Sequence, residues 1–141
     1  MANRTLAIIK PDAMKNGTTG NIYNRILDAE FKILGAKLIR MTISQAEGFY
    51  AVHTGRPFYA ELTEFMSSGQ CMVLALDKEN AVAAWRKIIG STDPQDAEEG
   101  TIRRDFATSI GENAVHGSDS DENAEKEIGF FFTESELIAN Q

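Results

Sequence analysis

The amino-acid sequence predicts a single α+β domain, a ferredoxin-like α/β sandwich in which helices cover one face of a mostly antiparallel four-stranded sheet. The chain has 141 residues, which is enough for one domain with its own core. Short apolar runs alternate along it with segments of helical periodicity. No Pro/Ser-rich linker, repeat or low-complexity tract divides it, so one domain spans residues 1–141.

The first elements are expected to be a strand and a helix. Residues 4–10 form an apolar run that Pro11 and Asp12 end, as in a buried strand. After a polar turn at residues 16–20, apolar side chains recur at helical spacing, and Gly35 is the expected C-terminal stop. The expected apolar face of this helix consists of Ile22, Tyr23, Ile26, Leu27 and Leu34.

A second strand and an inserted helical hairpin follow. Residues 36–43 alternate in the manner of a half-buried strand. Residues 44–47, Ser-Gln-Ala-Glu, match a capping box that opens a short helix. Gly55, Arg56 and Pro57 break the helical pattern, and a second apolar stripe then runs through Leu62, Phe65 and Met66.

The second half of the chain is predicted to begin with a third strand at residues 70–76. A helix marked by Val82, Trp85 and Ile89 follows it. A polar loop occupies residues 90–100, and a turn of helix covers residues 101–106. Residues 113–118 are long enough only for an edge strand or a turn. The last predicted helix is capped near Ser120.

Composition narrows the function. The formal net charge is −7, which argues against stable nucleic-acid binding because such proteins need a basic face. No apolar run approaches the roughly 20 residues of a membrane span, and the N-terminal segment does not resemble a signal peptide. The single cysteine, Cys71, lies in an apolar run and favours a reducing compartment. We therefore expect a cytoplasmic protein without a membrane association.

The usual nucleotide-binding and metal-binding patterns are absent from the sequence. There is no Gly-x-x-x-x-Gly-Lys-Ser/Thr loop, no Gly-x-Gly-x-x-Gly turn and no Cys/His ligand cluster, so no metal site is expected in the protein itself. Polar residues at the ends of elements remain as candidates. Taken singly, Lys10, Arg86 and Arg103 are more often exposed, solvated side chains than binding residues. A lone histidine such as His116 is more often structural than catalytic. Gly117 is expected to let a partner approach the His116 ring.

The segment Asn113-Ala114-Val115-His116-Gly117-Ser118-Asp119-Ser120 closely resembles the N-x-x-H-G-S-D signature of nucleoside diphosphate kinases. The resemblance extends over nearly the whole chain, through residues 5–13, residues 55–59, residues 100–103 and residues 124–128. It implies a ping-pong transfer of γ-phosphate from nucleoside triphosphates to nucleoside diphosphates with little base specificity.

The same resemblance implies roles for individual residues. His116 would carry the phosphate, Glu127 would hold its ring, and Ser118 would support that carboxylate. The other implied nucleotide contacts are Lys10, Arg86, Thr92 and Arg103 at the phosphates, Tyr50 as a hydrogen-bond partner beside the lysine, Asn113 with Lys10 at the sugar, and Phe58 with Ile110 around the base. Mg²⁺ would be held mainly by the nucleotide phosphates. Relatives imply a homo-oligomer built from dimers.

Two other functions are considered because fold alone does not decide function. An RNA-binding module of the same fold would need exposed aromatics on its sheet and a basic face, and the sequence has neither. A catalytically silent nucleotide-binding regulatory domain is the stronger alternative. Such a domain would have little use for both His116 and Glu127.

Overall fold

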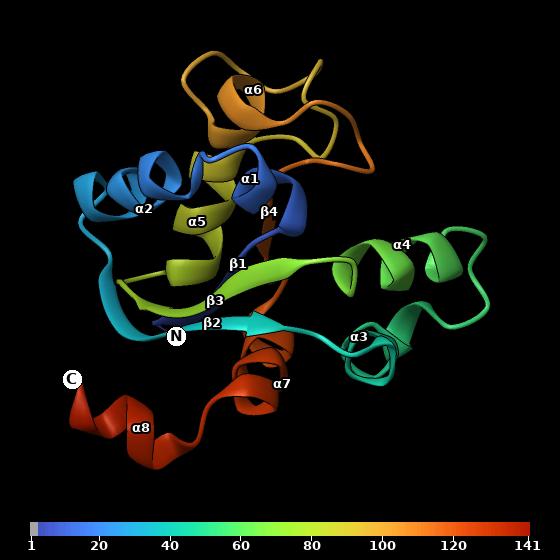
Figure 1. Cartoon of the computed structure of the whole chain (residues 1–141). Helices are drawn as coiled ribbons and strands as arrows, with labels where there is room; N and C mark the ends of the chain where they lie inside the picture. Colours follow the sequence, from blue (N-terminus) through green and yellow to red (C-terminus); the bar gives the residue numbers. More distant parts are fainter. Residues whose placement is uncertain (1–2) are drawn as a thin grey trace.

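The computed structural model describes residues 3–141 and confirms the predicted ferredoxin-like α+β class (Figure 1). Four strands form one sheet in the order β2-β3-β1-β4, and every neighbouring pair is antiparallel. The strands are β1 (Arg4–Ile9), β2 (Lys32–Arg40), β3 (Gln70–Asp77) and β4 (Val115–Gly117). The short β4 is an edge strand, as residues 113–118 predicted.

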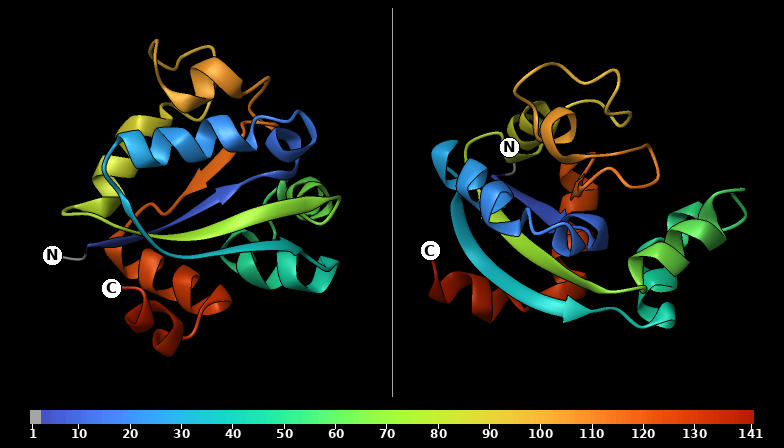
Figure 2. Two further views of the ribbon diagram at one scale, coloured as in Figure 1. Left: turned by 60° about the vertical axis from the view of Figure 1, so that its left-hand side comes forward. Right: turned by 45° about the horizontal axis from the view of Figure 1, so that its top comes forward.

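Helices connect the strands and cover the sheet. They are α1 (Pro11–Lys15), α2 (Thr19–Asp28), α3 (Ile43–Phe49), the 3₁₀ turn η1 (Ala51–His53), α4 (Tyr59–Met66), α5 (Ala81–Ile89), α6 (Ile102–Phe106), α7 (Asp121–Phe131) and α8 (Glu134–Ala139). The hairpin of α3 and α4 projects beyond one end of the sheet (Figures 1 and 2). Within residues 3–141, none of these helices has the length and apolar character of a membrane span.

The expectation that helices cover one face of the sheet is wrong, because both faces are covered (Figure 2). In β1, Ala7 and Ile9 belong to the core cluster that includes buried residues of α2 and α5. Leu6 and Ile8 belong to the opposite cluster, with buried residues of α3, α4, α7 and α8. This burial explains why β1 is continuously apolar from Leu6 to Ile9, since a strand covered on both sides does not alternate.

The predicted extent of the second helix is also wrong. Helix α2 ends at Asp28, and β2 begins at Lys32 after a turn in which Glu30 has φ +66°. Leu34 is therefore a buried strand residue, and Leu27 is 50% exposed on the outside of α2. Gly35 does not end a helix. A Cβ there would lie 2.7 Å from the Phe132 ring, so glycine lets the ring pack against β2.

Helix α3 begins two residues earlier than predicted. Its capping box joins Thr42 to Gln45, with the Thr42 hydroxyl accepting from the Gln45 N–H and the Gln45 amide oxygen accepting from the Thr42 N–H. Strand β2 accordingly ends at Arg40. Helices α1 and α8 were not predicted, although α8 has a second capping box between Thr133 and Glu136. Ser120 caps α7 as expected.

Candidate active site

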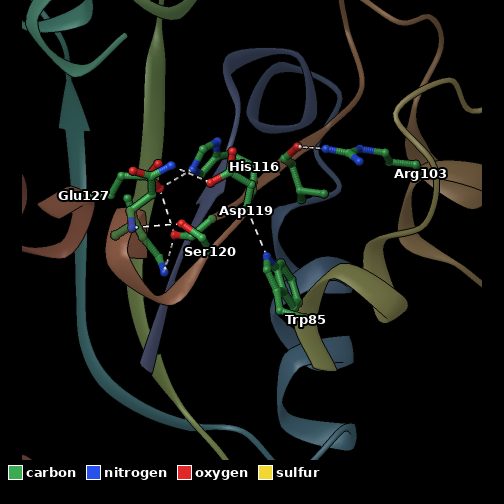
Figure 3. Close-up of polar contacts among 10 residues, drawn as sticks. Trp85, Arg103, His116, Asp119, Ser120 and Glu127 are labelled. Atoms are coloured by element: carbon green, nitrogen blue, oxygen red, sulfur yellow. Dashed lines mark hydrogen bonds and ion pairs between the residues drawn. The ribbon is translucent and has the colours of Figure 1, made fainter. Parts of the chain in front are cut away.

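His116 lies at the centre of β4, opposite Ile8 of β1. Its imidazole Nε2 lies 2.8 Å from Glu127 Oε1 of α7, and the Ser118 hydroxyl donates to the same oxygen over 2.8 Å (Figure 3). The Ser118 oxygen in turn accepts from the Leu6 N–H of β1. Because a carboxylate only accepts hydrogen bonds, Nε2 carries the proton and Nδ1 of the neutral ring has a free lone pair.

The surroundings of His116 favour the neutral ring. Burial is the main cause that lowers the pKa of His116 below its ordinary value of 6.5, and the charges of Lys10 and Arg103 lower it further. The hydrogen bond and the negative charge of Glu127 oppose this shift. The ring of Phe49 meets the imidazole edge-on at 5.5 Å, and the imidazole side chain remains 16% exposed. A neutral, partly accessible imidazole is a suitable nucleophile near pH 7.

Lys10 lies immediately after β1 and is buried except for 8% of its surface. Its Nζ donates to Asn113 Oδ1 over 2.8 Å, and the Asn113 amide donates to the Thr92 carbonyl over 3.3 Å. The pKa of Lys10 is lowered to about 8, mainly by burial and also by the charge of Arg103, while the charge of Asp12 opposes this shift. The site thus joins Lys10, Asn113 and Thr92 from three distant segments.

Arg103 of α6 is the most enclosed of the predicted phosphate-binding arginines. Its guanidinium donates to the Gly90 carbonyl over 3.0 Å and to the Val115 carbonyl over 2.9 Å (Figure 3). Burial lowers the pKa of Arg103 to about 10, and the charge of the exposed Arg86 contributes. Cations that lower one another's pKa raise the local positive potential, which favours a polyanion.

Two hollows meet at this group of cations. One of about 670 Å³ is lined by Lys10, Asn113 and Thr92 and also by Phe58 and Ile110. Phe58 is 44% exposed and Ile110 is 59% exposed, so two apolar side chains are presented to solvent beside the cations. The second hollow, of about 530 Å³, shares Thr92 with the first and is lined by Arg86 and Arg103. The combined shape accommodates a ligand with an apolar ring at one end and negative charge at the other.

A larger cavity, of about 770 Å³, contains none of the predicted site residues. It lies beside α7 and α8, and its lining includes the carboxylates Asp77, Asp121, Glu125 and Glu134. The cation in this lining is Arg4, which forms an ion pair with Glu134. A phosphate would be repelled there, so size does not identify the site.

Tyr50, which was expected to hydrogen-bond to the nucleotide beside Lys10, makes no direct hydrogen bond to Lys10. Its hydroxyl is buried without a hydrogen-bond partner among the described residues, and Lys10 bonds to Asn113 instead. Burial raises the pKa of Tyr50, and the negative charge of Glu127 adds to this. The tyrosine therefore stays neutral and packs its ring near His116, at a centroid distance of 6.4 Å.

The structure adds two residues that the sequence did not indicate. The Trp85 indole nitrogen donates to the His116 carbonyl over 3.0 Å (Figure 3), and Asp12 Oδ2 accepts from the Ala114 N–H over 3.0 Å. The expected purpose of Gly117 is wrong, because a Cβ there would lie 2.7 Å from Trp85 Cδ1. Glycine makes room for Trp85 rather than for a partner. A helical tryptophan and an aspartate after a strand have common structural uses, so no sequence signal marked them.

The chain is similar to known proteins over nearly its whole length. Residues 3–137 match the family described as nucleoside diphosphate kinase. A nucleoside diphosphate kinase of Salinibacter ruber is 56% identical over 137 residues, covering 97% of this chain and 96% of the relative.

Solved structures are similar over the same extent. The nucleoside diphosphate kinase of Aquifex aeolicus superposes with a TM-score of 0.94 at 45% identity, covering 96% of this chain and 98% of that one. A halophilic nucleoside diphosphate kinase from Halobacterium salinarum, in complex with CDP, has a TM-score of 0.92 at 35% identity, covering 97% of this chain and 91% of that one.

Proposed function

The chain belongs to the nucleoside diphosphate kinase family and is an enzyme of that kind, and on this premise we propose that it transfers the γ-phosphate in two half-reactions through a phosphohistidine at His116. The observation that carries the proposal is the contact of His116 Nε2 with Glu127 Oε1 at 2.8 Å. This contact leaves Nδ1 as the nucleophile. A regulatory domain that only bound nucleotides would gain nothing from such a contact.

In the first half-reaction, Nδ1 of His116 attacks the γ-phosphorus of a nucleoside triphosphate. The Nδ1–P bond forms, the bond from the γ-phosphorus to the β,γ-bridging oxygen breaks, and the nucleoside diphosphate leaves with that oxygen. The ring gains positive charge as the bond forms, and the Glu127 carboxylate stabilises that charge through Nε2–H. In the second half-reaction a different nucleoside diphosphate attacks the phosphohistidine and restores the free imidazole.

The cations supply what phosphoryl transfer needs most, which is positioning and positive charge around the transferred group. Lys10, Arg86 and Arg103 would contact the phosphates, with Thr92 where the two hollows meet. Lys10 and Asn113 would also hydrogen-bond the sugar.

Phe58 and Ile110 would enclose the base. They offer apolar contact without donors or acceptors, so discrimination among bases should be small. The CDP bound to the Halobacterium salinarum relative supports a nucleoside diphosphate as the ligand of this cleft.

Magnesium would accompany the nucleotide. Among residues 3–141 no group of three His, Cys, Asp or Glu side chains is placed to hold a metal ion. The ion would be bound through phosphate oxygens and water, which is a common arrangement for Mg²⁺. The ion would neutralise phosphate charge, while Lys10 and Arg103 orient the phosphate chain.

Intact-mass analysis after brief exposure to ATP and Mg²⁺ tests the proposal. We expect one added phosphate, mapped to His116, labile to acid and stable to alkali. His116→Ala should fold normally and lose both the adduct and essentially all transfer. An acid-stable adduct on Ser118 or Ser120 would replace the mechanism, and no adduct at all would favour the regulatory alternative.

We also propose a homo-oligomer built from dimers and a cytoplasmic location. The single cysteine, which is buried, suits a reducing compartment. Light scattering of the purified protein tests the first proposal, and cell fractionation tests the second. A monomer at micromolar concentration would contradict the assembly.

A further inference from the structure

Ala114, two residues before His116, has an unusual backbone conformation. Its φ is +72°, and the Val115 N–H donates to the Asn113 carbonyl over 2.8 Å. This pattern is that of a γ-turn whose central residue has a positive φ, which is strained for any residue except glycine. Ala114 is completely buried, and the turn connects the two predicted site residues Asn113 and His116. Some other part of the protein must therefore hold it.

The segment from Lys10 to Asp12 holds this turn from the other side. The Lys10 N–H donates to the Ala114 carbonyl over 2.9 Å, and the Ala114 N–H donates to Asp12 Oδ2 over 3.0 Å. The Lys10 ammonium donates to the Asn113 side chain. Both backbone groups of Ala114 are thus paired, and the Asp12 side chain supplies the only one of these bonds that a substitution can remove without changing the site residues themselves.

Asp12 is buried, and its second oxygen, Oδ1, has no hydrogen-bond partner among the described residues. The side-chain oxygen of an asparagine could also accept from the Ala114 N–H, whereas an alanine could not.

We propose that Asp12 is a positioning residue: its Oδ2 fixes the strained turn that places Asn113 and His116. The inference rests on the proposed function, since it concerns the same site. Asp12 itself touches neither the reacting phosphate nor the imidazole. It acts through the backbone of Ala114.

Two substitutions separate the hydrogen bond from the charge. Asp12→Asn keeps an acceptor for the Ala114 N–H and removes the charge, so phosphorylation of His116 should slow much less than in Asp12→Ala. Asp28→Asn, which removes an exposed charge on α2, is the matched control and should leave that rate unchanged. Equal losses in Asp12→Asn and Asp12→Ala would overturn the role of the hydrogen bond.

Asp12→Ala removes the acceptor as well, and phosphorylation of His116 at pH 7 should slow by about tenfold because the ring is displaced. Adding Ala114→Gly, which tolerates φ +72°, should restore a large part of that rate. No restoration would overturn the positioning effect. If Asp12→Ala does not fold, the rescue is scored on folding, where the double variant must recover soluble protein. Absence of any adduct in the wild type would instead reject the proposed function.

Discussion

The indole nitrogen of Trp85 donates a hydrogen bond to the backbone carbonyl of His116 over 3.0 Å. Helix α5 therefore fixes the main chain of His116 from one side of the sheet. Glu127 of α7 fixes the ring of His116 from the opposite side. Trp85 is fully buried, and the absence of a side chain at Gly117 lets the indole lie against β4. The nucleophile is fixed at two points, its carbonyl and its Nε2.

Gly117→Ala should disturb this arrangement. The new Cβ would meet Trp85 Cδ1 at 2.7 Å, so we expect a loss of about 1–3 kcal/mol in the free energy of unfolding and a slower phosphorylation of His116. Gly20→Ala is the matched control, because a Cβ there meets no atom within 4 Å and Gly20 lines neither nucleotide hollow. Urea melts and single-turnover rates measure both variants. Equal behaviour of the two variants would contradict the close packing of Trp85.

The pH dependence of kcat/KM should report the deprotonation of Lys10. Its pKa of about 8 lies well below the ordinary 10.5, so the ammonium loses its proton as pH rises through 8, and phosphate binding should weaken there. Arg103 has a pKa of about 10 and should not contribute until higher pH. A profile measured from pH 6 to 10 with saturating Mg²⁺ tests this. A level profile up to pH 10 would show that Lys10 is not needed in its charged form.

The same pKa has a consequence for stability. Between about pH 8 and 10.5 the unfolded chain binds a proton at Lys10 that the folded protein has released. The contribution of this lysine to stability therefore rises with pH across that window. Lys10→Met should flatten that part of the stability profile. Denaturant melts at several pH values would detect the difference, and parallel profiles for the two proteins would contradict it.

Glu127→Gln should slow the transfer without abolishing the fold. The amide can still hydrogen-bond the ring and Ser118, but it cannot stabilise the positive charge that the ring gains, so we expect a loss of about 10²-fold in kcat. Since Glu127 raises the pKa of His116, the variant should also move the acid fall of activity to lower pH. Glu125→Gln changes the same charge on an exposed position of α7 and serves as the control. Comparable losses in both would assign the effect to surface charge.

Phe58→Ala and Ile110→Ala should raise KM for every nucleotide by similar factors. Both side chains are substantially exposed, so the melting temperature should stay close to that of the wild type. The ratio of kcat/KM values among purine and pyrimidine substrates should change by no more than about tenfold. A wild-type preference beyond about a thousandfold for one base would reveal a hydrogen-bonding group that reads the base.

Salt should stabilise the protein. The formal net charge is −7, and Lys10 and Arg103 are buried, so the exterior is more negative than the total. Raising the salt concentration from 0.01 to 1 M shortens the Debye length from about 30 Å to about 3 Å and weakens the mutual repulsion of exposed carboxylates. We expect the melting temperature to rise with NaCl. Equal concentrations of a neutral osmolyte are the control, and a flat or falling midpoint in NaCl would reject the idea.

Strands and helices were predicted correctly where the apolar pattern fitted only one type of secondary structure. The runs that became β1 and β3 are too short for helices and are bounded by turns, and the spacing of Val82, Trp85 and Ile89 fits only a helix. Leu34 was misassigned because its spacing also fitted a continued helix. Only the packing of Phe132 against Gly35, 97 residues apart, shows why a strand forms there.

Prediction of the site residues likewise depended on whether a sequence pattern has only one interpretation. The string from Asn113 to Ser120 is specific, so His116 and its partner Glu127 could be named, and the structure places them in contact. Asp12 could not be named, since its partner Ala114 is 102 residues away and the contact is with the backbone. The backbone conformation of Ala114, φ +72°, is not a property that alanine indicates in a sequence.

The pairing of β4 with β1 limits where the chain can change length. His116 faces the α7 side of the sheet, and its neighbours Val115 and Gly117 face the α5 side. One residue inserted into β4 would exchange these directions and point the imidazole toward Trp85, away from Glu127. The exposed turn at Asn16 and Gly17, between α1 and α2, lines neither nucleotide hollow and could accept an insertion without moving β4. A fused peptide or an affinity tag placed inside the chain belongs in such a loop. In a deletion scan, deletions within β4 should be tolerated less well than deletions in the segments on either side of it.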